Sequence, residues 1–257
     1  MKTERFPGLA RELVDLKVDV IVASNTLAGR AAQQATATIP IVIPVMGDPV
    51  GDGLVVNLSR PGGNITGFTF LGPQLVPKRL ALLKEALPSA SRVVVLWHPG
   101  AYGERTMNDM MVEAETAARA LGLNLRYVPV QGSGEFDKAF STISAERADA
   151  VIVFPSPMLF TERNIIVDLA VKHRLALIAM GKEFVESGAL LSYGADINDF
   201  IRRSASYVDK ILKGAKPGEL PVEQPTKFEL FINLKTATQL GLELPATLVA
   251  RADKVIE

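Results

Sequence analysis

The chain of 257 residues contains no cysteine, which excludes disulfide bonds, thiolate metal sites and cysteine nucleophiles. It also has no apolar run near the roughly 20 residues that are needed to span a bilayer. Basic residues are not in excess, because 28 Lys and Arg balance 28 Asp and Glu. Since nucleic-acid binding needs a basic surface to neutralise phosphates, we expect no nucleic-acid partner.

The motifs of the common enzyme classes are missing as well. His98 and His173 are the only histidines, and neither has the His-Glu-x-x-His spacing of a metalloprotease. There is no Gly-x-Ser-x-Gly elbow, no Gly-x-Gly-x-x-Gly and no phosphate-binding loop ending in Gly-Lys-Ser/Thr. Gly132-Ser133-Gly134 reads as a turn, and His173 as a structural residue beside Lys172 and Arg174 at a helix end, where cations suit the helix dipole. We therefore expect no catalytic residues, no metal and no cofactor.

What the chain does contain is a regular alternation of apolar runs and amphipathic segments. Hydrophobic residues make up 48% of it, enough for a well-filled core and against disorder. Continuous apolar strands separated by helices are typical of parallel sheets that are covered on both faces. The predicted strands are 18–23, 39–45, 65–70, 92–97, 123–130, 150–154, 175–180 and 189–193. The predicted helices are 28–36, 54–58, 77–86, 106–121, 135–146, 161–173 and 198–213.

Polar residues follow the first of these strands at the carboxyl edge, where open α/β sheets bind their ligands. Ser24, Asn25 and Thr26 come after strand 18–23 and before a helix. Their side chains and the helix amino-terminal N–H groups could bind a carboxylate. The alternative interpretation is ordinary capping of the helix.

Candidate ligand contacts follow four further strands. Asp48 ends strand 39–45 within Gly-Asp-Pro, where it suits an ammonium group or simply forms a turn. His98 lies in a loop that is either a pocket or plain surface. Ser156 offers a hydroxyl, and Tyr193 an aromatic ring that could stack on a ligand.

Several motifs occur together in one known family. They are Gly47-Asp48-Pro49-Val50-x-x-Gly53-Leu54-Val55, Arg60-Pro61-Gly62-Gly63-Asn64-x-Thr66-Gly67, Ser192-Tyr193-Gly194, and the stretches 207–217, 221–230 and 233–237. From about Arg5 to Glu257 the chain resembles the substrate-binding proteins of ABC transporters, in the family that includes the tryptophan- and tyrosine-binding lipoproteins.

The resemblance implies an α/β fold of two Rossmann-like lobes with parallel sheets, like the type I periplasmic binding proteins, with a ligand cleft between the lobes. We expect residues 1–71 to form the first lobe, 72–182 the second, 183–215 to return to the first, and 216–257 to supply a crossing segment and the carboxy-terminal elements. The implied function is capture of a small molecule, an amino acid or related carboxylate with an aromatic one as the first guess. The implied partner is an ABC permease in the membrane.

The alternative is an enzyme or a ligand-sensing regulator on the same α/β architecture, because fold alone does not fix function. An enzyme would need a nucleophile or a tuned acid/base pair. A regulator would need a basic DNA-binding segment, which the sequence does not show.

The amino terminus carries no signal-peptide pattern, although the resemblance implies a periplasmic or membrane-anchored protein. Proteins of this kind also have at least one strand–helix unit before Arg5, so we expect the first unit of the fold to be missing here. An open sheet edge pairs with other chains. We therefore expect either a homodimer or poor stability as a monomer.

Overall fold

The computed structural model describes residues 3–257 and divides into two compact units. The first unit contains the residues up to Pro73, Tyr102–Met107 and Asp196–Thr226. The second contains Gln74–Ala101, Asn108–Ala195 and Lys227–Glu257. The chain thus passes between the units five times, after residues 73, 101, 107, 195 and 226. None of the helices within residues 3–257 is long and apolar enough to cross a membrane.

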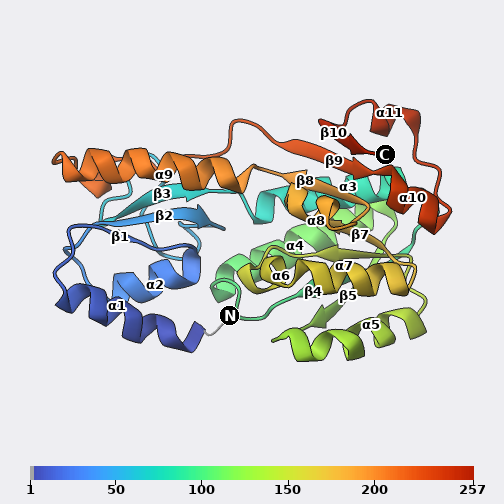
Figure 1. Ribbon diagram of the computed structural model, residues 1–257, viewed down its shortest axis with the longest axis horizontal. Coiled ribbons are helices and arrows are strands. Elements are labelled where there is room, and N and C mark those ends of the chain that lie inside the picture. Colours follow the sequence, from blue (N-terminus) through green and yellow to red (C-terminus); the bar gives the residue numbers. More distant parts are fainter. Residues whose placement is uncertain (1–2) are drawn as a thin grey trace. The chain divides into compact units, whose positions relative to one another are not determined.

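The first unit is a small parallel sheet with helices on both faces, in strand order β1-β2-β3. Helices α1 and α2 lie together on one face and α9 packs on the other (Figure 1). Ile41, Ile43 and Met46 of β2 are fully buried between these layers. The elements are η1 (Thr3–Arg5), α1 (Phe6–Asp15), β1 (Ile21–Val22), α2 (Thr26–Ala35), β2 (Ile41–Met46), β3 (Ile65–Thr69), α9 (Ile197–Leu212) and η4 (Pro217–Glu219).

One edge of this sheet is covered by a segment from far along the chain. Glu223 forms a parallel bridge with Phe68. Its N–H donates to the Gly67 carbonyl at 3.0 Å, and its carbonyl accepts from the Thr69 N–H at 2.9 Å. Part of the stretch that was expected to be a crossing segment therefore extends the sheet beyond β3.

The other edge is β1, which is shorter than the predicted strand 18–23. Only Ile21 and Val22 pair with β2, and the Val22 side chain is 55% exposed. Strand β1 is the outer strand of the sheet in the described part of the chain.

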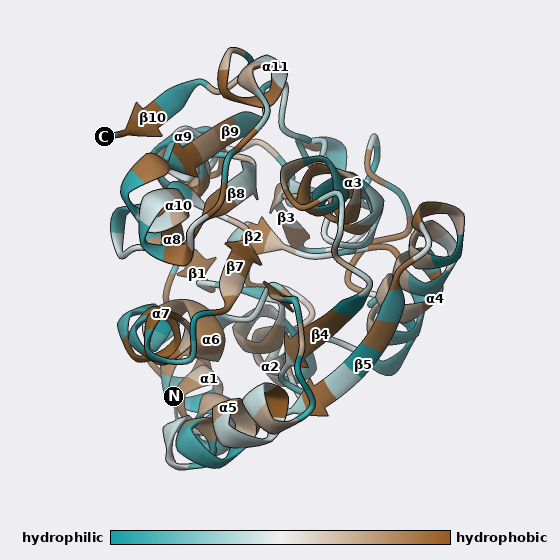
Figure 2. Ribbon diagram, turned by 90° about the vertical axis from the view of Figure 1, so that its right-hand side faces the viewer, coloured by the Kyte–Doolittle hydropathy of each residue, from teal (hydrophilic) through white to brown (hydrophobic). Residues whose placement is uncertain are grey.

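The second unit is built on a seven-stranded sheet of order β10-β9-β8-β7-β6-β4-β5. Figure 2 shows α4 on the opposite side of β4 from α6, and the central strand β7 in the hydrophobic colour. Its elements are η2 (Pro73–Leu75, at the boundary), α3 (Val76–Ala86), β4 (Arg92–Trp97), α4 (Glu104–Leu121, which begins in the first unit), β5 (Asn124–Pro129), η3 (Ser133–Glu135), α5 (Phe136–Ala145), β6 (Ala150–Val153), α6 (Pro157–Thr161), α7 (Arg163–Lys172), β7 (Ala176–Ala179), α8 (Lys182–Glu186), β8 (Leu191–Gly194), β9 (Glu229–Asn233), α10 (Leu234–Leu240), α11 (Ala246–Val249) and β10 (Lys254–Ile256).

Strands β5, β4, β6, β7 and β8 all run parallel to one another, as the continuous apolar runs predict. Strand β9 runs antiparallel to β8, with Ser192 opposite Phe231, and β10 runs parallel to β9. The chain returns to the second unit at Lys227 and enters the sheet from the opposite direction. No feature of the sequence predicts this reversal.

Three of the sequence predictions need correction. Residues 54–58 are not a helix, since they form turns in which the N–H groups of Leu54 and Val55 both donate to the Pro49 carbonyl. The predicted helix 161–173 corresponds to α7, and a separate short helix, α6, precedes it and ends at Thr161. Residues 183–195 lie with the second unit, whereas the sequence places the return to the first lobe at residue 183.

Candidate functional site

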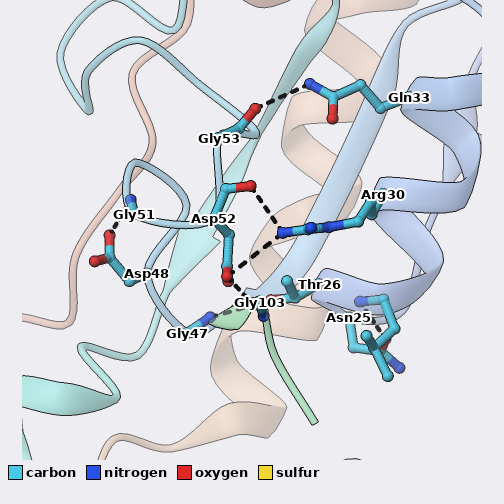
Figure 3. Close-up of polar contacts among 11 residues, drawn as sticks. Asn25, Thr26, Arg30, Gln33, Gly47, Asp48, Gly51, Asp52, Gly53 and Gly103 are labelled. Atoms are coloured by element: carbon cyan, nitrogen blue, oxygen red, sulfur yellow. Dashed lines mark hydrogen bonds and ion pairs between the residues drawn. The ribbon is translucent and has the colours of Figure 1, made fainter. Parts of the chain in front are cut away.

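The carboxyl ends of β1 and β2 form one edge of the first unit, since the two strands are parallel. The structure brings the loops after these strands together. The Thr26 hydroxyl accepts a hydrogen bond from the Gly47 N–H at 3.3 Å (Figure 3). Thr26 is only 1% exposed, so its role in the structure is to hold the Gly47–Asp48 turn against the start of α2.

Asn25 is the amino-terminal cap of α2. Its Oδ1 accepts from the N–H groups of Leu27 and Ala28, at 3.0 and 3.1 Å. Its Nδ2 donates to the Ser24 hydroxyl at 3.1 Å, and Ser24 itself is exposed. The capping interpretation is therefore confirmed for Asn25, and a ligand contact through these residues stays a prediction.

Asp48 forms the turn that its Gly-Asp-Pro context predicts. Its Oδ1 accepts from the Gly51 N–H at 2.9 Å, and the residue is half-buried. Figure 3 shows Asp48 in the same loop as Asp52, to which its negative charge is electrostatically coupled. The turn occupies one carboxylate oxygen of Asp48, and contact with a ligand ammonium stays a prediction.

Asp52 is a buried carboxylate that sequence reasoning missed. Its side chain is fully buried, and its Oδ1 accepts from the Gly103 N–H at 2.8 Å. Arg30 donates to its main-chain carbonyl at 2.8 Å and lies 3.5 Å from its carboxylate. Burial raises the pKa of Asp52, against the opposing effects of Thr106, Gly103 and Arg30. Asp52 thus joins α2, the loop after β2 and the start of α4.

His98 and Ser156 follow β4 and β6, which are neighbouring parallel strands of the second unit. His98 Nδ1 accepts from the Gly100 N–H at 3.0 Å, and burial lowers its pKa, which favours a neutral ring. Ser156 is 6% exposed and caps α6 by accepting from the Leu159 N–H at 3.4 Å. Both residues shape loops at the same sheet edge.

Tyr193 lies in β8 and is half-buried. Its ring stacks on Phe228, with centroids 5.9 Å apart and an interplanar angle of 27°. Its carbonyl accepts from Nε of Arg79, a residue on α3 that is only 1% exposed. Arg79 therefore fixes the end of β8, although no feature of the sequence singles this residue out.

Within residues 3–257, no group of three or more acidic or histidine side chains lies close enough to hold a metal ion.

Two α/β units joined by repeated passages of the chain, with polar loops at the carboxyl edges of their sheets, define a type I periplasmic-binding-protein-like fold. The chain belongs to the family described as ABC transporter substrate binding protein, whose family model matches residues 2–256. It is therefore a solute-binding component of an ABC transport system.

Individual relatives agree with this assignment. A tyrosine-binding protein of Clostridioides difficile is 27% identical over 237 residues, which cover 92% of this chain and 67% of that protein. A conserved domain protein from Vibrio cholerae is 30% identical, with a TM-score of 0.91 over 99% of this chain and 84% of the other. An ABC domain from Streptococcus pneumoniae, solved in complex with L-Trp, is 24% identical, with a TM-score of 0.90 over 99% and 86% of the two chains, and shows the shared fold.

Proposed function

We propose that this chain binds an aromatic amino acid or a closely related aromatic carboxylate and delivers it to an ABC permease in the membrane. The observation that carries the proposal is the relationship to the tyrosine-binding protein, which extends over 92% of this chain. Family membership supports a solute-binding protein over an enzyme or a ligand-sensing regulator.

The proposed ligand contacts come from loops at the carboxyl edges of both sheets. In the first unit, Asp48 is half-buried and has the charge to pair with an ammonium group, while Ser24 is exposed. Asn25 and Thr26 are buried and hydrogen-bonded within the protein, so we propose that they position these loops. In the second unit the proposed contacts are His98, Ser156 and Tyr193.

Ligand class is tested by a thermal unfolding screen with the purified chain. The panel contains L-tyrosine, L-tryptophan, L-phenylalanine, 4-hydroxybenzoate, L-leucine and adenine. A ligand that binds only the native state stabilises it by about 2.7 kcal/mol at 100 times its Kd. We expect the aromatic amino acids to raise the melting temperature most. A rise with adenine or L-leucine alone would overturn the aromatic assignment.

The role of Asp48 is tested with a ligand that lacks the amino group. Asp48→Asn keeps an oxygen that can accept from the Gly51 N–H, but it removes the charge. We expect this variant to weaken L-tyrosine binding about tenfold or more, because hydrogen bonds to charged groups contribute about 1.5–3 kcal/mol. Binding of 3-(4-hydroxyphenyl)propionate should change little. Asp168→Asn, at an exposed position on α7, is the matched control.

The proposed place of action is outside the cytoplasmic membrane, where substrate-binding proteins of ABC importers meet their permeases. The test is reconstitution of the chain with the ABC permease of its own transport system in proteoliposomes. Uptake of a labelled aromatic amino acid should require the chain on the external side. Uptake that is unaffected by omitting the chain would contradict the delivery role.

A further inference from the structure

Tyr102 covers the backbone at the carboxyl end of β2. A Cβ atom added to Gly47 would lie 2.8 Å from Cε1 and 2.9 Å from Cδ1 of the Tyr102 ring. The ring of Phe70, which follows β3, lies 6.2 Å from the Tyr102 ring at an angle of 53°. Phe70 is 1% exposed whereas Tyr102 is half-buried, so the Tyr102 ring is the more accessible of the two.

The position of Gly47 places this ring among the proposed ligand contacts of the first unit. Gly47 precedes Asp48, and its N–H donates to Thr26 at the start of α2. Its carbonyl accepts from the Thr69 hydroxyl at 2.9 Å, at the end of β3. The ring therefore packs where the ends of the three strands meet, although Tyr102 comes from residues 102–107, far along the chain.

Asp52 anchors the segment that carries Tyr102. Its carboxylate accepts from the N–H of Gly103, the next residue, at 2.8 Å. Arg30 in turn holds the Asp52 main chain from α2. A buried carboxylate that accepts a backbone N–H fixes the local path of the chain, so the bond to Gly103 restricts where Tyr102 can lie.

We propose that Tyr102 is a specificity-determining residue whose ring packs against the aromatic ring of the ligand, and that Asp52 positions it. The inference rests on the proposed function and deepens it, because it assigns a residue to the selection of aromatic ligands. Packing of two aromatic rings strengthens binding by about two- to twelvefold beyond the burial of area. Tyr102 thereby favours ring-bearing solutes over aliphatic ones of similar size.

The experiment measures the Kd of L-tyrosine and L-tryptophan by isothermal titration calorimetry. Tyr102→Leu should weaken both ligands by about two- to twelvefold, whereas Tyr102→Phe, which keeps the ring, should stay close to the wild type. The matched control is Tyr127→Leu, a half-buried ring on edge strand β5 of the second unit. Circular dichroism confirms that each variant is folded before titration.

A second pair of variants separates ring position from general damage. Gly47→Ala introduces the Cβ that forces the Tyr102 ring to move, so it should weaken binding in the wild type and have little further effect in Tyr102→Leu. Asp52→Ala should weaken binding in the same coupled way. Asp52→Asn retains an oxygen for the Gly103 N–H and should restore most of the affinity. Such coupling identifies residues that act through a shared group.

The outcomes distinguish the inference from the function on which it rests. If the wild type binds neither amino acid, the proposed function fails and this inference fails with it. If the wild type binds them and Tyr102→Leu binds as tightly as Tyr127→Leu, only the role of Tyr102 is overturned. Additive effects of Gly47→Ala and Tyr102→Leu would overturn it equally.

Discussion

The hydroxyl of Tyr207 lies 2.8 Å from a carboxylate oxygen of Glu223 and 2.7 Å from the Pro221 carbonyl, to which it donates hydrogen bonds. Tyr207 is on α9, and Glu223 belongs to the segment that pairs with β3. Arg203 forms an ion pair with the same carboxylate and lies 5.1 Å above the Phe68 ring. Two sequence motifs that carried the family resemblance thus meet to close one edge of the first sheet.

We expect Tyr207→Phe to lower the free energy of unfolding of the first unit by about 1–3 kcal/mol. Tyr207 is 2% exposed, and the substitution removes the donor from two acceptors. Urea unfolding followed by circular dichroism measures the change. Tyr127→Phe is the control, because it removes the hydroxyl of a half-buried tyrosine from the second unit, where that hydroxyl lies 3.4 Å from the Met111 carbonyl. Equal stability of Tyr207→Phe and the wild type would contradict the prediction.

Gly67→Ala should disrupt the pairing of β2 and β3. The residue has φ of +142°, and an added Cβ would lie 2.0 Å from the Ile43 carbonyl oxygen. A clash with backbone in a buried sheet is expected to destabilise by more than about 4 kcal/mol. Gly63→Ala, where nothing lies within 4 Å of an added Cβ, should change stability by less than about 0.5 kcal/mol. Soluble yield and thermal unfolding of both variants provide the comparison.

We expect the contribution of Asp52 to the free energy of unfolding to decrease as the pH rises above about 3.8. Burial raises the pKa of Asp52 above the ordinary value of 3.8 for an aspartate, with Arg30 opposing this and Asp48 adding to it. Between 3.8 and the raised value, the native state holds more protons than the unfolded state, so stability decreases with pH in that window. Urea unfolding of the wild type and Asp52→Asn from pH 3.5 to 7 measures this. The stability of the wild type relative to the variant should decline and then level off, and a constant or rising difference would refute the assignment.

The open edge of β1 is expected to promote self-association. Val22 is 55% exposed on this outer strand, and edge strands pair with other chains unless charged residues protect them. Light scattering and native mass spectrometry should show a dimer at high concentration, and Val22→Lys should be monomeric. The control is Val56→Lys, because Val56 is 75% exposed in a loop. A stable wild-type monomer at all concentrations would exclude both the homodimer and the instability expected from the sequence.

The strands were the most predictable part of the fold. Strand β4 runs from Arg92 to Trp97, as its apolar run predicts. The short β1 differs because a strand extends only as far as its partner pairs with it, and the partner lies elsewhere in the chain. Residues 54–58 were predicted to be helical because of their apolar composition, but they form no helix. Strand β9 was not predicted, because the apolar run at its centre is only the three residues Leu230–Ile232.

The candidate site was predictable only where residues follow strands directly. The sequence placed Thr26 and Asp48 at one sheet edge, and the bond between Thr26 and Gly47 joins their loops. Asp52 and Tyr102 could not be found in this way. Their roles depend on contacts between residues some 50 positions apart, such as Asp52 with Gly103, and local periodicity carries no information about such contacts.

The five passages of the chain between the units have a consequence for synthesis on the ribosome. The first unit needs α9 to cover its sheet and Glu223 to close the edge at β3, and both are translated after most of the second unit. Its first three strands therefore emerge long before the residues that cover them. Exposed apolar surface and unpaired strand edges are what chaperones bind and what drives aggregation of nascent chains. The order of the segments thus leaves the first unit, although its strands are translated first, incomplete until the segment at Asp196–Thr226 has emerged.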